Sequence, residues 1–348
     1  MEKGILSIPI YKQNVSLENV LKEILNYTIE ADKLHIDEAF FGEHLTDRHE
    51  KIPSSLMMVS ALSQVTNKIR LGTLTTNLNF YNPSVLASLI AMADNLSKGR
   101  LILGIGSGAN QTDLEAIGSL EKKNYEIMLE YYEIIKKLLK TNDVIDIKSK
   151  NFSVSTIKSA NEKLGLGYFN NLYQNRDNLE VLMPVLNQGS YNVEICSKNR
   201  WSIAISNFCS QEIVEDHIKR YLEYSPLEKK AALKKIRITR YFHLLENKND
   251  IKKYRYLENS PYIESTKILY DKLKTFKKDS VFGKNVSNLK DAVDNILLTG
   301  TPDKVNEYIN EIKNKFGDIK SIVFVTVPKT NLSQYDNSLK LFANDVKA

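Results

Sequence analysis

The chain has 348 residues, 42% hydrophobic and 26% charged, with a formal net charge of +6. Lysines are interspersed with acidic residues along the expected helices, so a mixed solvated surface is expected and not a nucleic-acid groove. The two cysteines, Cys196 and Cys209, are too few for a disulfide framework and lack metal-ligand spacing. An apolar run of about 18 residues and a signal-peptide cleavage pattern are both missing, so a cytoplasmic protein without a membrane span is expected.

Short apolar runs alternate with helical patterns in the amino-terminal part of the chain. Strands are expected over residues 4–10, 36–41, 68–75 and 101–106, and helices over 17–25, 54–66, 83–96 and 120–139. Pro83 is placed at a helix start, where its missing N–H costs nothing. Alternation of strand and helix predicts βαβ units and a parallel sheet.

The pattern weakens after the fourth helix. Residues 141–191 are polar and rich in Asn, and they are expected to form an insertion. Beyond them, strands are expected over 192–196, 236–245, 297–300 and 319–327, and helices over 199–207, 211–224, 227–233, 250–257, 264–276, 301 onward and 333–346. Seven or eight strand–helix pairs predict an α/β fold, a TIM (β/α)8 barrel with insertions, built as one domain over residues 1–348.

Chemistry in such barrels lies at the carboxyl ends of the strands. Glu43 and His44 follow the expected strand 36–41, where a histidine can donate or accept a proton near neutral pH. The alternative is a histidine that only caps a loop. Asp47, His49 and Glu50 follow, but their spacing does not fit a metal site, and no metal is expected.

A glycine-rich turn follows the expected strand 101–106. Gly104 to Ala109 fits the loose G-x-G-x-x-G/A pattern, in which backbone can approach a phosphate or a flat ring. The turn follows the fourth strand and not the first, so a tight turn of small residues is favoured over a Rossmann fingerprint. The segment from Asn110 to Asp113 follows the same strand and belongs to the chemical side of the sheet.

Ser197 to Arg200 are expected to follow the strand 192–196 and to open a helix. Free backbone N–H groups, a hydroxyl and a guanidinium at a helix start would make an anion site. The alternative is an ordinary helix cap with a surface arginine.

Together these motifs resemble the bacterial luciferase-like flavin-dependent monooxygenases, and most of all the limonene-monooxygenase branch. The matching pieces are G-E-H at 42–44, T-N-K-I-R-L-G-T at 66–73, A-x-x-x-x-M-A-D-N-L-S-K-G-R at 87–100 and L-G-I-G-S-G-A-N-Q-T-D at 103–113. T-G-T-P-D-K-V at 299–305 is a weaker match.

The resemblance implies an enzyme that binds reduced FMN at the carboxyl end of the barrel, as a diffusible co-substrate supplied by a separate flavin reductase. Oxygen would add to the flavin to give a C4a-peroxide that oxidises a small organic substrate. His44 matches the family's catalytic histidine. The implied cofactor-binding positions are Glu43, Leu74, Thr75, Asn77, Gly106 and Ser107, with Ser197, Asn199 and Arg200 as the phosphate-binding loop.

The same resemblance implies a non-prolyl cis bond at Leu74–Thr75, a mobile lid at 277–288 and a homodimer formed through the second and third helices. Two alternatives stay open. One is an F420-dependent oxidoreductase on the same barrel, which would transfer hydride without oxygen. The other is a non-catalytic, flavin-binding luciferase-like partner protein.

Overall fold

The chain folds around a closed parallel barrel, which confirms the predicted TIM barrel. The computed structural model describes residues 1–169, 179–257, 259–276, 286–329 and 337–348. The barrel strands are β1 (Glu2–Ser7), β2 (Glu38–Phe41), β3 (Arg70–Thr73), β5 (Leu101–Gly106), β8 (Glu180–Val185), β9 (Ser202–Ile205), β10 (Ile236–Leu244) and β12 (Ser321–Val325). Pairing of β9 with β10 closes the barrel.

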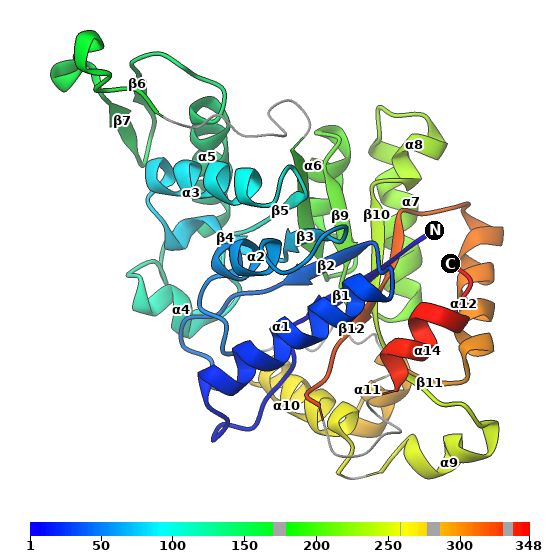
Figure 1. The fold of residues 1–348 in the computed structure, drawn as a ribbon. Coiled ribbons are helices and arrows are strands. Elements are labelled where there is room, and N and C mark those ends of the chain that lie inside the picture. Colours follow the sequence, from blue (N-terminus) through cyan, green and yellow to red (C-terminus); the bar gives the residue numbers. More distant parts are fainter. Residues whose placement is uncertain (170–178, 258, 277–285, 330–336) are drawn as a thin grey trace.

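Helices surround the barrel and cover its carboxyl end (Figure 1). They are α1 (Leu17–Lys33), α2 (Ser55–Ser63), α3 (Pro83–Leu96), α4 (Gln111–Ala116), α5 (Asn124–Leu138), α6 (Tyr191–Lys198), α7 (Gln211–Tyr224), α8 (Lys229–Leu233), α9 (Ile251–Tyr254), α10 (Pro261–Thr275), α11 (Leu289–Ile296), α12 (Pro302–Lys315) and α14 (Ser338–Asp345). Shorter strands are β4 (Thr76–Asn77), the hairpin β6 (Asp146–Lys148) and β7 (Ser153–Ser155), and β11 (Leu297–Gly300), which pairs with β10. In the described part of the chain no helix has the length and apolar character needed to cross a membrane.

Local sequence explains where the helices nearest the site begin. The Ser54 hydroxyl accepts the N–H of Met57 at the start of α2, and the Asn82 side chain accepts the N–H groups of Ser84 and Val85 ahead of Pro83. Such caps satisfy donors that have no partner within the helix. Each cap fixes the point at which the chain turns from a strand exit into a helix.

For two neighbouring segments the secondary structure is the reverse of the prediction. Residues 192–196, predicted as a strand, lie within helix α6, and residues 202–205 of the predicted helix 199–207 form strand β9. A short apolar run does not distinguish a strand from a buried helix turn. Val193 and Cys196 are buried at helical spacing, whereas all of Ser202–Ile205 is buried, as a barrel strand requires.

The predicted insertion at 141–191 contains an element that sequence patterning missed. Its residues 180–185 form barrel strand β8, whose Pro184 is atypical of a strand interior. The hairpin of β6 and β7 precedes this strand. Of the predicted lid at 277–288, residues 277–285 lie outside the described residues, and residues 286–288 lead into α11.

The barrel interior has a charged layer and an apolar layer. At the amino ends of the strands, the fully buried Arg237 donates to both Glu38 oxygens at 2.9 Å and to Glu180 at 2.8 Å. Nearer the carboxyl ends, apolar side chains of β1, β2, β5, β8 and β12 join side chains of α10 and α11 in one cluster. The buried ion pairs close the amino end of the barrel, and the two helices cover the other end.

Candidate active site

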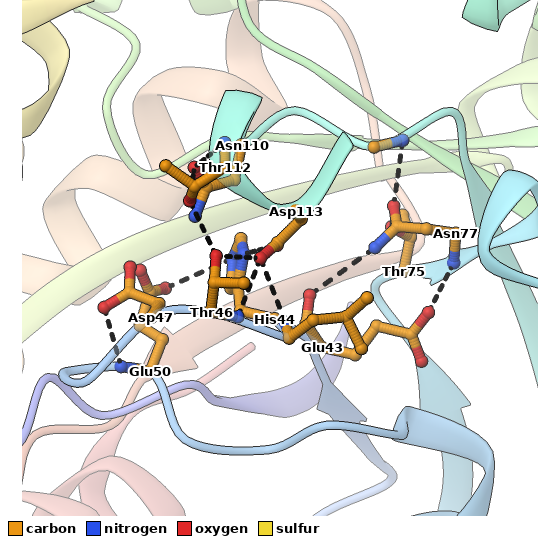
Figure 2. Close-up of polar contacts among 12 residues, drawn as sticks. Glu43, His44, Thr46, Asp47, Glu50, Thr75, Asn77, Asn110, Thr112 and Asp113 are labelled. Atoms are coloured by element: carbon orange, nitrogen blue, oxygen red, sulfur yellow. Dashed lines mark hydrogen bonds and ion pairs between the residues drawn. The ribbon is translucent and has the colours of Figure 1, made fainter. Parts of the chain in front are cut away.

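Three neighbouring strands bring the predicted site segments together. β2, β3 and β5 are adjacent in the barrel, so the exits at Gly42–His44, Leu74–Asn77 and Gly106–Gly108 lie side by side. Figure 2 shows His44, Thr75, Asn77 and Asp113 converging at this edge. Leu74, Thr75, Gly106 and Ser107 are partly exposed, whereas the strands that carry them are buried. The strand exits therefore form one accessible strip.

Glu43 is buried, and its carboxylate holds the backbone of this strip in place through hydrogen bonds. Its carboxylate is 2% exposed and accepts the N–H of Asn77 at 2.7 Å and the N–H and hydroxyl of Ser55 at 2.9 Å each. Tyr81 donates to the same carboxylate at 3.2 Å. Burial raises the pKa of Glu43 despite these hydrogen bonds. The side-chain oxygens of Glu43 are occupied by protein donors, so this residue fixes the exits of β2 and β3 relative to each other.

The Leu74–Thr75 peptide bond is cis, as predicted. The hydroxyl of Thr75 and the N–H of Gly108 both donate to the Asn77 side-chain oxygen, at 3.0 and 3.2 Å. Gly106 packs so closely that an added Cβ would lie 2.5 Å from the Thr75 hydroxyl oxygen. The carbonyl of Ser107 accepts a hydrogen bond from Asn79 at 3.2 Å. Packing therefore requires a glycine at position 106, and this exit carries no side chain there.

His44 is held between carboxylates. Its Nδ1 lies 3.0 Å from Asp113 Oδ2, and its Nε2 lies 3.8 Å from Glu50 Oε1. The other Asp113 oxygen accepts the N–H of Thr46 at 2.8 Å and of Leu45 at 3.2 Å. Asp113 therefore orients the imidazole and the loop that follows it (Figure 2).

The carboxylates decide the charge of His44. Burial alone would lower the pKa of His44, but Glu50 and Asp113 outweigh burial and raise the pKa to about 9. Burial alone would likewise raise the pKa of Asp113, but hydrogen bonds from His44 and Thr46 hold it below its usual range. At neutral pH the pair is an imidazolium and a carboxylate. The raised pKa of His44 therefore favours a ring that can donate a proton.

Sequence reasoning missed the partners of His44. The sequence pattern places Asp113 on the chemical side of the barrel without giving it a role, and it offers Glu50 only as one of several residues whose spacing does not fit a metal site. Lys272, which binds Glu50 at 2.9 Å, gave no local signal because it lies 222 residues away. Within the described ranges no group of three or more His, Cys, Asp or Glu residues is arranged to hold a metal.

The structure contradicts the helix start on which the predicted anion site at Ser197, Asn199 and Arg200 depends. These residues end helix α6 and precede β9, so they lie at the amino end of a strand, opposite to His44. The Ser197 hydroxyl is fully buried and donates to the Tyr221 carbonyl at 2.6 Å, and Asn199 donates to the Ile195 carbonyl. Because strand and helix are exchanged here, no helix begins at Ser197, and the physical basis for an anion site is lost.

Known proteins resemble this chain in both sequence and fold. A family model described as luciferase-like monooxygenase matches residues 3–163, which confirms the resemblance read from the motifs. Limonene 1,2-monooxygenase of Rhodococcus erythropolis is 27% identical over 136 residues, or 39% of this chain and 35% of that protein. An F420-dependent glucose-6-phosphate dehydrogenase of Amycolatopsis mediterranei is 28% identical over 145 residues, or 39% of this chain and 43% of that protein. The matches thus span less than half of these relatives.

The fold match covers nearly the whole chain. The oxygenating constituent of 3,6-diketocamphane monooxygenase from Pseudomonas putida, a type II Baeyer-Villiger monooxygenase solved with FMN, superposes with a TM-score of 0.86. The superposition covers 99% of this chain and 97% of that one at 19% identity. At this identity the likeness concerns the barrel and its surrounding helices.

Proposed function

We propose that this chain, whose residues 3–163 match the luciferase-like monooxygenases, is an FMN-dependent monooxygenase acting on a small organic substrate. The observation that carries the proposal is the position of His44 at the exit of β2, where Asp113 lies 3.0 Å from its Nδ1. The imidazole fixed by Asp113 lies at the carboxyl end of the barrel, beside the accessible strip at the exits of β3 and β5, and the raised pKa of His44 favours its protonated form. A reaction that builds negative charge on oxygen needs such a donor.

The residues of the strip fit a flavin. Leu74, Thr75, Gly106 and Ser107 are partly exposed, and Gly106 carries no side chain that would obstruct a flat ring. We assign these positions to the flavin ring, with Glu43 and Asn77 holding their backbone in place. Reduced flavin bound there would supply the electrons that activate dioxygen. We also propose that a separate flavin reductase delivers it.

His44 has a defined task in this scheme. Since Asp113 accepts the proton on Nδ1, the proton on Nε2 is the one that can be offered to a reacting oxygen. The imidazolium would stabilise an anionic oxygen and then donate its proton. Asp113 keeps the ring in the orientation that points Nε2 away from α4.

An F420-dependent oxidoreductase is the second candidate. The F420-dependent glucose-6-phosphate dehydrogenase of Amycolatopsis mediterranei is about as similar to this chain as the limonene enzyme, at 28% against 27% identity, and each likeness covers 39% of this chain. A histidine that donates a proton also suits hydride transfer to a carbonyl group, because the alkoxide that forms must be protonated. The cofactor that binds decides between the two candidates.

The test is an anaerobic titration of the purified protein with photoreduced FMN, followed by mixing with oxygenated buffer. Saturable binding and a delayed return of the oxidised flavin spectrum would support the monooxygenase. The His44→Gln variant should bind reduced FMN within a few-fold of the wild type but lose the delay, because the flavin contacts are assigned to other residues. Failure of reduced FMN to bind, with saturable binding of F420, would replace the first candidate by the second.

We propose that the protein forms a homodimer through α2 and α3. These two helices contact each other on the barrel's outer face, and they carry exposed apolar side chains. Met57 of α2 is 73% exposed, and Val85 and Met92 of α3 are each 55% exposed. Apolar side chains gathered on adjacent helices are the composition expected of an interface core.

A further inference from the structure

Helix α10 packs at the carboxyl end of the barrel (Figure 1), and His44 follows the carboxyl end of strand β2. Tyr262 and Leu269 of α10 are buried in the same apolar cluster as Leu6, Phe40 and Val323 of the barrel. The Tyr262 hydroxyl also donates to the Phe242 carbonyl of β10 at 2.8 Å. The helix is therefore seated on the barrel by apolar contacts along one face, and its last turn extends toward the loop after β2.

Lys272 joins this last turn to the loop that carries His44. Its ammonium group binds Glu50 Oε2 at 2.9 Å and also binds the Asp47 carboxylate. The two carboxylates are 12% and 8% exposed at the side chain, and the lysine is 26% exposed. Burial alone would lower the pKa of Lys272, but Glu50 and Asp47 raise it, so the lysine stays charged. This is a shielded ion pair between segments far apart in the sequence and not a surface pair.

Lys272 and His44 share Glu50. One oxygen of Glu50 is 2.9 Å from the lysine nitrogen, and the other is 3.8 Å from Nε2 of His44, which is beyond hydrogen-bond distance. Asp113 occupies the far side of the imidazole at 3.0 Å. The result is a row of alternating charges: ammonium, carboxylate, imidazolium, carboxylate.

We propose that Lys272 is a positioning residue for His44: by binding Glu50 and Asp47 from helix α10, it holds Glu50 back from Nε2 and leaves the Nε2 proton for a reacting oxygen. This inference rests on the proposed function. Without the lysine, the nearest positive charge to Glu50 is the His44 imidazolium, and the carboxylate would close on Nε2. His44 would then be more strongly protonated but less able to donate.

Other charged or titratable groups also act on His44. Asp47 of the same loop and Asp113 of α4 both raise the pKa of His44. Tyr241 of β10 interacts with Glu50, whose charge raises the pKa of the tyrosine. Replacing Lys272 leaves these groups in place and removes one positive charge from the row. Attraction of an uncompensated carboxylate shifts a histidine pKa upward by about one unit or more.

The experiment is an NMR titration of ligand-free protein labelled with ¹³C in its histidine rings. The chain has five histidines, and the signal of His44 is assigned by its loss in His44→Gln. Lys272→Met should raise the pKa of His44 by about one unit. Lys272→Arg should leave it within a few tenths of the wild-type value. In Lys272→Met combined with Glu50→Gln, the pKa should fall below the wild-type value.

Lys267→Met is the matched control, since Lys267 is an exposed lysine on the same helix. It removes the same charge and should leave the pKa of His44 unchanged. An unchanged or lowered pKa in Lys272→Met, with native circular dichroism, would overturn the inference. The titration needs no flavin, so failure of reduced FMN to bind would remove the proposed function while the pKa still decides the role of Lys272. If reduced FMN binds, the delay before its reoxidation by oxygenated buffer should be shorter in Lys272→Met than in the wild type. In Lys267→Met the delay should equal that of the wild type.

Discussion

Asp113 Oδ2 lies 3.0 Å from Nδ1 of His44, although the two residues are 69 positions apart in the chain. The contact joins the exit of β2 to helix α4, which follows β5. Because Asp113 also accepts the N–H groups of Leu45 and Thr46, one carboxylate sets both the ring orientation and the path of the loop. The acid–base behaviour of the site therefore depends on a helix that contributes no residue to the accessible strip at the strand exits.

Replacing Asp113 by Asn should lower the pKa of His44 by about one unit, because a neutral amide cannot stabilise the imidazolium as a carboxylate does. An amide oxygen can still accept from Thr46, so the loop should persist. Turnover should fall about tenfold or more if His44 is the proton donor. Histidine NMR titration measures the pKa. Asp143→Asn, at an exposed position, is the control, and equal pKa values in the two variants would contradict the proposed pairing.

The raised pKa of His44 predicts how stability depends on pH. A histidine whose folded pKa is about 9 contributes its full stabilisation below its unfolded value of about 6.5, and this contribution is lost as pH rises from there through 9. In urea unfolding at pH 6, the free energy of unfolding of the wild type should therefore exceed that of His44→Gln by on the order of 1–3 kcal/mol. This difference should be smaller at pH 9.5. A difference that is the same at both pH values would mean that His44 has an ordinary pKa.

The parts of this site that are local in sequence could be predicted. The exits at Gly42–His44 and Gly106–Gly108 each follow a short apolar run, and adjacent strands bring such exits together. The Glu50–Lys272 contact depends on where α10 sits on the barrel, which no local pattern encodes. Ser197 to Arg200 were misplaced because Asn192–Cys196 has too few apolar residues to reveal whether its period is that of a strand or a helix.

The buried ion pairs at the amino end of the barrel should contribute strongly to the stability of the fold. Arg237 is fully buried between Glu38 and Glu180, and although burial alone would raise the pKa of Glu180, Arg237 and Arg70 hold it below its usual range. Arg237→Met would leave Glu38 buried without its guanidinium partner, at a cost of about 3–5 kcal/mol. Chemical denaturation measures this loss.

The control for Arg237 is Arg255→Met, which breaks a more exposed pair with Asp294. That change should alter the free energy of unfolding by less than about 1 kcal/mol, because solvent screens the pair. Similar effects of the two substitutions would show that the barrel interior admits enough water to solvate Glu38.

The proposed dimer makes a prediction that is independent of the chemistry. Met92→Glu places a charge among the exposed apolar side chains of α2 and α3, and it should convert the dimer into a monomer, since an unpaired carboxylate in an interface core costs several kcal/mol. Light scattering coupled to size exclusion measures the mass. Leu164→Glu is the matched control, because Leu164 is 70% exposed but lies in the segment between α5 and β8. The control should stay dimeric, and a wild-type protein that is monomeric at every concentration would exclude the interface.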